Sequence, residues 1–74
     1  MRSSKNVLIS LVVPFFNEEE IIRSSIHKIS LVMKSLKKSF EIILVDDGSS
    51  DYSGLKAKNA LKEFNIYNST LITL

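Results

Sequence analysis

The sequence contains no cysteine, no tryptophan, one proline and two glycines among its 74 residues. Without cysteine the chain forms no disulfide and no thiolate zinc site, and thiol catalysis is excluded. The absence of cysteine fits a reducing, cytoplasmic location. We expect no membrane span, because the apolar run at 7–13 stops at Pro14, far short of the roughly 18 residues that a span requires.

The charges are mixed and show no concentration of one sign. Ten Lys and Arg residues and eight Asp and Glu residues give a net charge of +2. No run of Lys or Arg with interleaved aromatic residues is present, so we expect no nucleic-acid partner. A chain of this length forms one small domain that buries only about 60% of its unfolded surface, so its core is marginal.

Three apolar runs predict β-strands. Residues 7–13 and 40–45 are nearly continuous and rich in β-branched side chains, which is typical of strands covered on both faces. We expect Pro14 to close the first strand, because proline cannot donate to a ladder. Residues 71–74 predict a third strand.

Two segments between these strands predict helices. The first helix is expected from about Glu18 to Lys38, with Asn17 as its N-cap and Glu20 in the capping-box position. Its apolar stripe consists of Ile22, Ile26, Ile29, Met33 and Leu36. A second helix is expected after a cap at Ser50 or Asp51, with an inward face formed by Ala57, Ala60, Leu61 and Phe64 and an end near Asn65.

The resulting order predicts an α/β fold, a Rossmann-like βαβαβ unit with a parallel sheet. In such sheets ligands bind in the crevice beyond the carboxyl ends of the strands. Two polar turns follow the first two strands and would form two walls of one site.

The turn at 46–51 reads Asp-Asp-Gly-Ser-Ser-Asp. Gly48 permits a sharply turned backbone close to a ligand. A carboxylate at a strand end can bond a base or a ribose, and we expect Asp47 to face the crevice and Asp46 to be its structural partner. The alternative is a simple turn in which Asp51 caps the next helix.

The turn at 14–18 reads Pro-Phe-Phe-Asn-Glu. Phe16 could stack on a nucleobase, since every base has a π-face. The alternative is that Phe15 and Phe16 are core residues beside a helix cap. Glu18, Asp47 and Asp51 supply too few ligands for a metal cage. The dinucleotide and P-loop glycine fingerprints are both absent.

Together the two turns and their strands resemble the start of a family 2 glycosyltransferase. The similar segments are Leu-Val-Val-Pro-Phe-Phe-Asn-Glu-Glu-Glu at 11–20 and Glu-Ile-Ile-Leu-Val-Asp-Asp-Gly-Ser-Ser-Asp at 41–51. The similarity is greatest to the branch of dolichol-phosphate mannose synthase and bacterial polyprenyl-phosphate glycosyltransferases. It extends over nearly the whole chain.

The resemblance implies a nucleotide-diphospho-sugar transferase fold of glycosyltransferase A type, whose N-terminal half binds the nucleotide. The implied nucleoside pocket consists of Pro14, Phe16, Glu18, Val45 and Asp47, with Asp47 bonding the base. Phe16 stands where the family often has tyrosine, so it keeps the stacking face without the hydroxyl. The implied reaction passes a sugar from UDP or GDP to an acceptor, often polyprenyl phosphate at the cytoplasmic side of a membrane, with Mg or Mn on the diphosphate.

The family's Asp-x-Asp metal segment, acceptor site and catalytic base follow a fourth strand, which would lie beyond Leu74. We therefore expect residues 1–74 to be the nucleotide-binding part of a glycosyltransferase domain, truncated after the third strand, with no catalytic residue and no metal of its own. Two alternatives stay open. One is a non-catalytic remnant that binds nucleotide or self-associates through an open sheet edge. The other is a fragment of a receiver-like signalling domain, because Leu-Val-Asp-Asp resembles the acidic end of a receiver strand.

Overall fold

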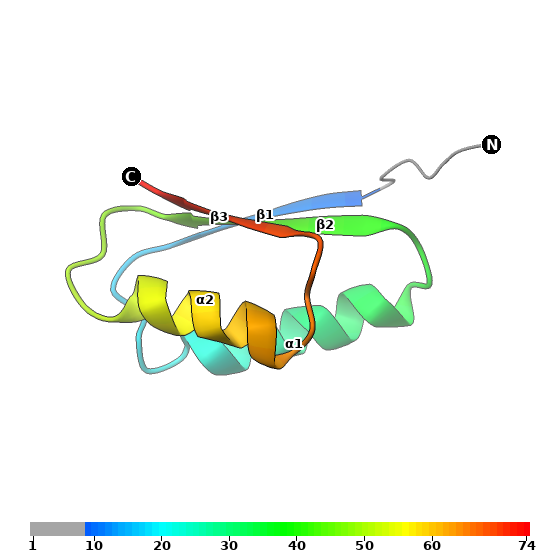
Figure 1. The fold of residues 1–74 in the computed structure, drawn as a ribbon, viewed down its shortest axis with the longest axis horizontal. Helices are drawn as coiled ribbons and strands as arrows, with labels where there is room; N and C mark the ends of the chain where they lie inside the picture. The colour runs from blue at the N-terminus through cyan, green and yellow to red at the C-terminus, as the bar shows by residue number, and fades with distance from the viewer. Residues whose placement is uncertain (1–8) are drawn as a thin grey trace.

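A three-stranded parallel sheet with two helices on one of its faces forms the fold (Figure 1). The structure, a computed structural model, describes residues 9–74. The elements alternate along the chain as β1 (Ile9–Phe15), α1 (Ile22–Ser35), β2 (Phe40–Asp46), α2 (Ser53–Glu63) and β3 (Ser69–Thr73). The predicted α/β class and βαβαβ order are confirmed, while Val7 and Leu8 of the predicted first strand lie outside the described residues.

The strands lie in the order β1-β2-β3 and end level with one another. Pro14 is in register with Val45, and Val45 with Ile72. Because all three strands run in the same direction, the turns that follow β1 and β2 emerge at the same edge of the sheet, at the left of Figure 1. The parallel register therefore places the two polar turns side by side.

The hydrophobic core lies between the sheet and the two helices. Its buried members are Phe15, Ile22, Ile26, Met33, Ile42, Leu44, Ala57, Ala60, Leu61 and Ile66. The predicted stripe of the first helix is largely confirmed, but Leu36 is 45% exposed because α1 ends at Ser35, one residue before it.

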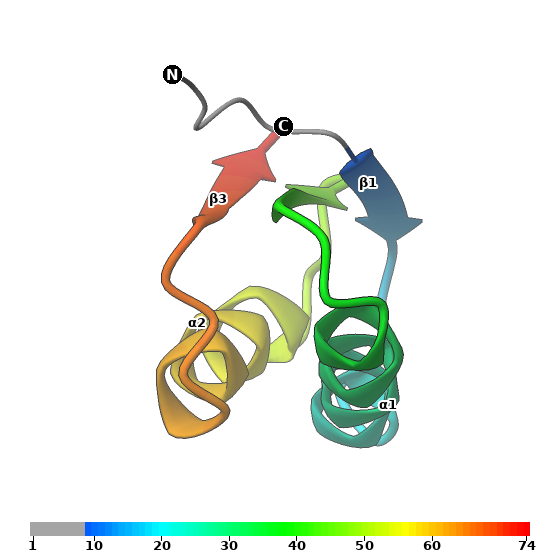
Figure 2. The ribbon, with the colours of Figure 1, turned by 90° about the vertical axis from the view of Figure 1, so that its right-hand side faces the viewer.

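The opposite face of the sheet carries no helix in the described part of the chain (Figure 2). Val12 and Ile72 on that face are 57% and 43% exposed. The prediction of strands covered on both faces is therefore wrong for residues 9–74. Both crossovers step across the sheet in the same direction, so both helices lie on the same side.

Pro14 lies inside β1 and does not close it, contrary to the prediction. The Ile9 N–H donates to Ser39 and the Phe15 carbonyl accepts from Asp47, so the odd-numbered residues of β1 direct their backbone groups toward β2. With a period of two, the position of Pro14 directs its backbone away from β2. The missing N–H therefore costs no bond between the strands.

The helix starts also differ from the prediction. A turn at 18–21, closed by bonds from the N–H groups of Ile21 and Ile22 to the Glu18 carbonyl, delays the start of α1 to Ile22. Asn17 is not its N-cap, because its backbone is left-handed with φ 49° and its side chain bonds elsewhere. α2 begins at Ser53 with Tyr52 in the N-cap position, so the predicted cap at Ser50 or Asp51 is wrong, although the Asp51 carboxylate does accept from the Ser53 N–H. β3 begins at Ser69, two residues before the predicted start.

Candidate functional site

Two loops meet at the carboxyl edge of the sheet: loop 1 (residues 16–21, between β1 and α1) and loop 2 (residues 47–52, between β2 and α2). The first residue of loop 2 is bonded to the last residue of β1, directly before loop 1, because the Asp47 N–H donates to the Phe15 carbonyl at 2.9 Å. The predicted pair of polar turns thus forms one continuous surface.

The adjacent aspartates of β2 and loop 2 lie in different environments. Asp46 is only 4% exposed, and its carboxylate accepts a hydrogen bond from the Ser49 N–H at 2.8 Å. Asp47, one residue later, is exposed. Asp46 is therefore the structural partner, as predicted from the alternation of strand residues.

Asp46 also explains a glycine in the first turn of α2. A Cβ at position 54 would lie 2.7 Å from the Asp46 Oδ2 atom, closer than such atoms approach. Gly54 is therefore required by the close approach of a buried carboxylate, although glycine is unfavourable in a helix.

Asn17 bridges the two loops. Its Oδ1 atom accepts from the Ser50 N–H at 2.8 Å, and its own N–H donates to the Ser49 hydroxyl at 2.9 Å. The two bonds run in opposite directions between neighbouring residue pairs and hold the centre of loop 1 against loop 2.

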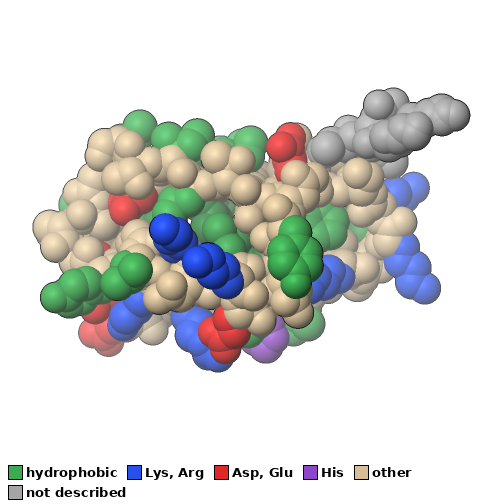
Figure 3. Space-filling view, viewed as in Figure 1, with side chains coloured by type: hydrophobic (Ala, Val, Ile, Leu, Met, Phe, Trp, Pro, Cys, Tyr) green, Lys and Arg blue, Asp and Glu red, His purple; other side chains and the backbone are tan. Residues whose placement is uncertain are grey.

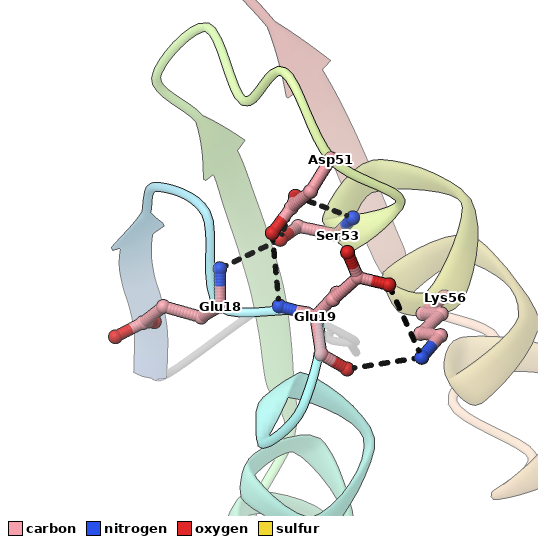
Figure 4. A network of polar contacts seen from close by, with 5 residues as sticks. All are labelled: Glu18, Glu19, Asp51, Ser53 and Lys56. Carbon is pink, nitrogen blue, oxygen red and sulfur yellow. Dashed lines mark hydrogen bonds and ion pairs between the residues drawn. The ribbon is translucent and has the colours of Figure 1, made fainter.

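A second network fixes the loops beside the start of α2 (Figure 4). The buried Ser53 hydroxyl accepts from the Glu18 N–H at 2.7 Å and donates to the Asp51 carboxylate at 2.5 Å. The other Asp51 oxygen accepts from the Glu19 N–H at 3.3 Å. Lys56 completes the network with an ion pair to the Glu19 carboxylate at 3.5 Å.

This network determines the acidity of Asp51. Desolvation raises the pKa of the Asp51 carboxyl, but hydrogen bonds from the Ser53 hydroxyl and from the N–H groups of Ser53 and Glu19 outweigh it, so the pKa lies below its ordinary value of 3.8. Asp51 therefore stays a carboxylate and acts as a fixed acceptor for loop 1.

Because the hydrogen bonds between the loops use the backbone N–H groups of loop 1, the groups that loop 1 presents to solvent are side chains. The N–H groups of Asn17, Glu18 and Glu19 are all bonded to loop 2 or Ser53. These groups are therefore not available to hold a phosphate. By contrast, Phe16 is 55% exposed, and Figure 4 shows the Glu18 carboxylate pointing away from the network.

The five residues predicted for a nucleoside pocket all lie at this edge. Pro14 and Val45 are cross-strand neighbours. The next residues along the two strands, Phe15 and Asp46, are buried against the helices. Because side chains alternate along a strand, Pro14 and Val45 face the uncovered side of the sheet. Phe16 and Asp47 follow immediately in the loops. In residues 9–74 no hydrogen bond or ion pair occupies the carboxylates of Glu18 or Asp47.

The described carboxylates do not form a metal site. Within residues 9–74 no group of three or more His, Asp or Glu side chains converges to hold an ion. Asp51 uses both of its carboxylate oxygens within the network, so it has no free oxygen to share with Glu18 and Asp47.

Several hollows lie on the surface of the described residues, and two of them differ in their relation to the candidate site. One borders the candidate site and is lined by Asn17, Glu18, Glu19, Glu20, Ile21 and Asp51. The larger one lies between α2 and β3 and is lined by none of the five residues predicted for the nucleoside pocket. Figure 3 shows apolar side chains at its floor and Lys or Arg side chains beside it.

In the described part of the chain no helix is long and apolar enough to cross a membrane.

Sequence reasoning missed the residues that connect the loops. It assigned Asn17 to a helix cap and did not single out Ser49 or Ser53. Their partners lie more than 30 positions away in the sequence, so no local pattern indicates the bonds. The burial of Ser53 is the one property that would have indicated its role, and a serine in the first turn of a helix does not by itself indicate burial.

Comparison with known proteins gives a consistent result. Residues 10–73 match the family described as Glycosyl transferase family 2, which leaves the receiver-like interpretation without support. The chain is 47% identical over 51 residues to an undecaprenyl-phosphate 4-deoxy-4-formamido-L-arabinose transferase of Yersinia enterocolitica, covering 69% of this chain and 16% of that protein. It is 40% identical over 55 residues to the protein of the same name from Enterobacter sp., covering 74% of this chain and 17% of that protein. The matched part thus spans about one sixth of the length of these relatives.

Proposed function

The chain belongs to glycosyl transferase family 2, and on this premise we propose that loops 1 and 2 form the nucleoside-binding part of a site for a UDP- or GDP-sugar. The observation that carries the proposal is the pairing of an exposed aromatic ring, Phe16, with an exposed carboxylate, Asp47, on two loops that are bonded to each other. A base can stack on the ring and donate hydrogen bonds to the carboxylate.

Each remaining pocket residue has a role in this proposal. Pro14 and Val45 offer an apolar surface on the uncovered side of the sheet, next to the bound base. Glu18 presents a carboxylate that the loop network does not use. Guanine offers two neighbouring N–H donors to a carboxylate and uracil offers one, so Asp47 would favour GDP over UDP if it pairs in bidentate fashion.

We further propose that residues 1–74 are the N-terminal nucleotide-binding part of a domain that transfers a sugar to a polyprenyl phosphate at the cytoplasmic side of a membrane. The acceptor class is supported by the names of the relatives, which refer to undecaprenyl phosphate. Family 2 glycosyltransferases generally use a divalent metal, but the described carboxylates do not fit Mg or Mn. We therefore expect the 74 residues alone to transfer no sugar.

Self-association is a second proposed property of the isolated chain. It is supported by the apolar side chains on the uncovered face of the sheet and by the two edge strands, β1 and β3, whose outer backbone groups can pair with another strand. Nucleotide binding and self-association are compatible, because the loops lie at the end of the strands.

Titration calorimetry with UDP and GDP tests the nucleotide proposal. Asp47→Ala removes a charged acceptor, and hydrogen bonds to charged groups contribute about 1.5–3 kcal/mol. The affinity should therefore fall by about tenfold or more. Glu41→Ala is the matched control, because it removes an equal charge at the opposite end of β2. Equal affinity of Asp47→Ala and the unsubstituted chain would overturn the proposal.

A further inference from the structure

Asn17 is the one side chain of loop 1 that bonds to loop 2 within the described residues. The N–H groups of Asn17, Glu18 and Glu19 donate to side chains of loop 2 or to Ser53, and Glu19 also contacts Lys56 of α2 through its carbonyl and carboxylate oxygens. The Asn17 amide oxygen instead accepts from the Ser50 N–H at 2.8 Å and lies 3.4 Å from the Ser50 hydroxyl. The bridge therefore depends on the identity of this residue.

The backbone conformation of Asn17 also limits which residues can replace it. Its φ of 49° lies in the left-handed region, which Asn tolerates better than most residues with a side chain. That conformation directs the Asn17 N–H to the Ser49 hydroxyl while the side chain reaches the next residue of loop 2. A residue at this position must supply both a left-handed backbone and a short acceptor.

The bridge lies between the groups that the proposed function requires. Asn17 is flanked by Phe16 and Glu18 on loop 1, and its partners follow Asp47 by two and three residues on loop 2. The separation of the aromatic ring from the Asp47 carboxylate therefore depends on how firmly the two loops are held together.

We propose that Asn17 is a positioning residue of the nucleoside site, which fixes loop 1 against loop 2 so that Phe16 and Asp47 contact one base together. This inference rests on the proposed function. The second network still holds Glu18 and Glu19, but without the bridge the centre of loop 1 must be ordered against loop 2 when the ligand binds, and that ordering weakens the affinity. Asn17 touches no ligand in this proposal and acts through its neighbours.

Substitutions at position 17 distinguish the contribution of the left-handed backbone from that of the side-chain acceptor. Asn17→Gly keeps the left-handed backbone and removes the acceptor. Asn17→Asp keeps an acceptor oxygen in a residue that also tolerates this backbone, and pairing it with Glu20→Gln leaves the charge of loop 1 unchanged. Asn65→Gly is the matched control: Asn65 is also left-handed, with φ 57°, and accepts one hydrogen bond, from Tyr67, beyond the end of α2.

The affinity for UDP and GDP is measured by calorimetry, and the protection of the Ser50 amide by hydrogen exchange without nucleotide. We expect Asn17→Gly to weaken the better-bound nucleotide about tenfold, which corresponds to about 1.4 kcal/mol, and to expose the Ser50 amide. The charge-balanced Asn17→Asp variant should restore both readouts. Asn65→Gly should change neither, even if it lowers the melting temperature equally.

Unchanged affinity in Asn17→Gly, with the unsubstituted chain binding nucleotide, would overturn the positioning role and leave the proposed function standing. A folded unsubstituted chain that binds neither nucleotide would overturn the proposed function and this inference with it. Should Asn17→Gly fail to fold, Ser49→Ala removes the reciprocal bond alone. It should weaken binding in the same direction by a smaller factor, and unchanged affinity in that variant would also overturn the inference.

Discussion

At the scale of single residues, Asp51 is one of the acceptors that join the two loops. Its carboxylate accepts bonds from Ser53 and Glu19, and these bonds hold its pKa below the ordinary value. A carboxyl with a lowered folded-state pKa stabilises the fold above its unfolded-state pKa, and that contribution disappears as the pH falls through the folded-state pKa.

We therefore expect the free energy of unfolding to decrease as the pH is lowered below about 4. Asp51→Asn should be less stable than the unsubstituted chain at pH 6, and the difference should shrink toward pH 2. Urea unfolding of both chains over a series of pH values measures this. Parallel stability curves for the two chains would show that Asp51 makes no such contribution.

Some residue roles could be predicted from the sequence and others could not. The separation of Asp46 from Asp47 follows from the alternation of a strand, and Asp46 is indeed buried. The roles of Asn17 and Ser53 depend on partners in distant parts of the chain. Asparagine is a preferred helix cap, but the left-handed backbone of Asn17 and the bond of its side chain to loop 2 exclude that role.

At the scale of elements, the first turn of α2 is fitted to the end of β2 through Gly54 and Asp46. Intrinsic helix propensity favours alanine over glycine by about 1 kcal/mol. Here the added Cβ would lie 2.7 Å from the Asp46 carboxylate, which is buried and held by Ser49. The carboxylate cannot move without losing that hydrogen bond.

We expect Gly54→Ala to lower the free energy of unfolding by about 1–2 kcal/mol, because overpacking outweighs propensity. Asn59→Ala, at an exposed position of the same helix, is the control and should not be destabilising. Urea unfolding followed by circular dichroism measures both variants. A more stable Gly54→Ala variant would mean that the carboxylate adjusts without cost.

The existence and type of each element were predictable, but the ends were not. Apolar periodicity identified both helices and all three strands. The end of β1 was misplaced because Pro14 occupies a position whose N–H faces away from β2, which depends on the register of the sheet. The start of α1 was misplaced because bonds to loop 2 and to Ser53 of α2 hold residues 17–19 outside the helix.

At the scale of the whole molecule, the described chain covers only one face of its sheet. Pro14, Val45 and Ile72 form one row across the uncovered face, beside Val12 of the next row. Apolar surface of this kind favours association with another surface. The family and the parallel sheet were recognisable from the sequence, whereas the uncovered face follows from the order of three neighbouring strands.

We expect the isolated 74 residues to self-associate as their concentration is raised, which sedimentation velocity can measure. The double variant Val12→Thr, Ile72→Thr keeps β-branched side chains in the strands and should shift the distribution toward the monomer. Leu31→Gln alters an equally exposed apolar residue on α1 and should leave the association unchanged. A monomer with a cooperative melt that does not depend on concentration would contradict the expectation.

The central claim is that loops 1 and 2 bind the nucleoside of a nucleotide-sugar, and an amide NMR titration of the chain with UDP and then GDP, with and without Mg, tests it most directly. The account predicts saturable shifts at Phe16, Glu18 and Asp47 and their immediate neighbours, with the stronger response identifying the donor base. A dispersed spectrum that neither nucleotide changes, or shifts confined to the hollow between α2 and β3, would contradict it.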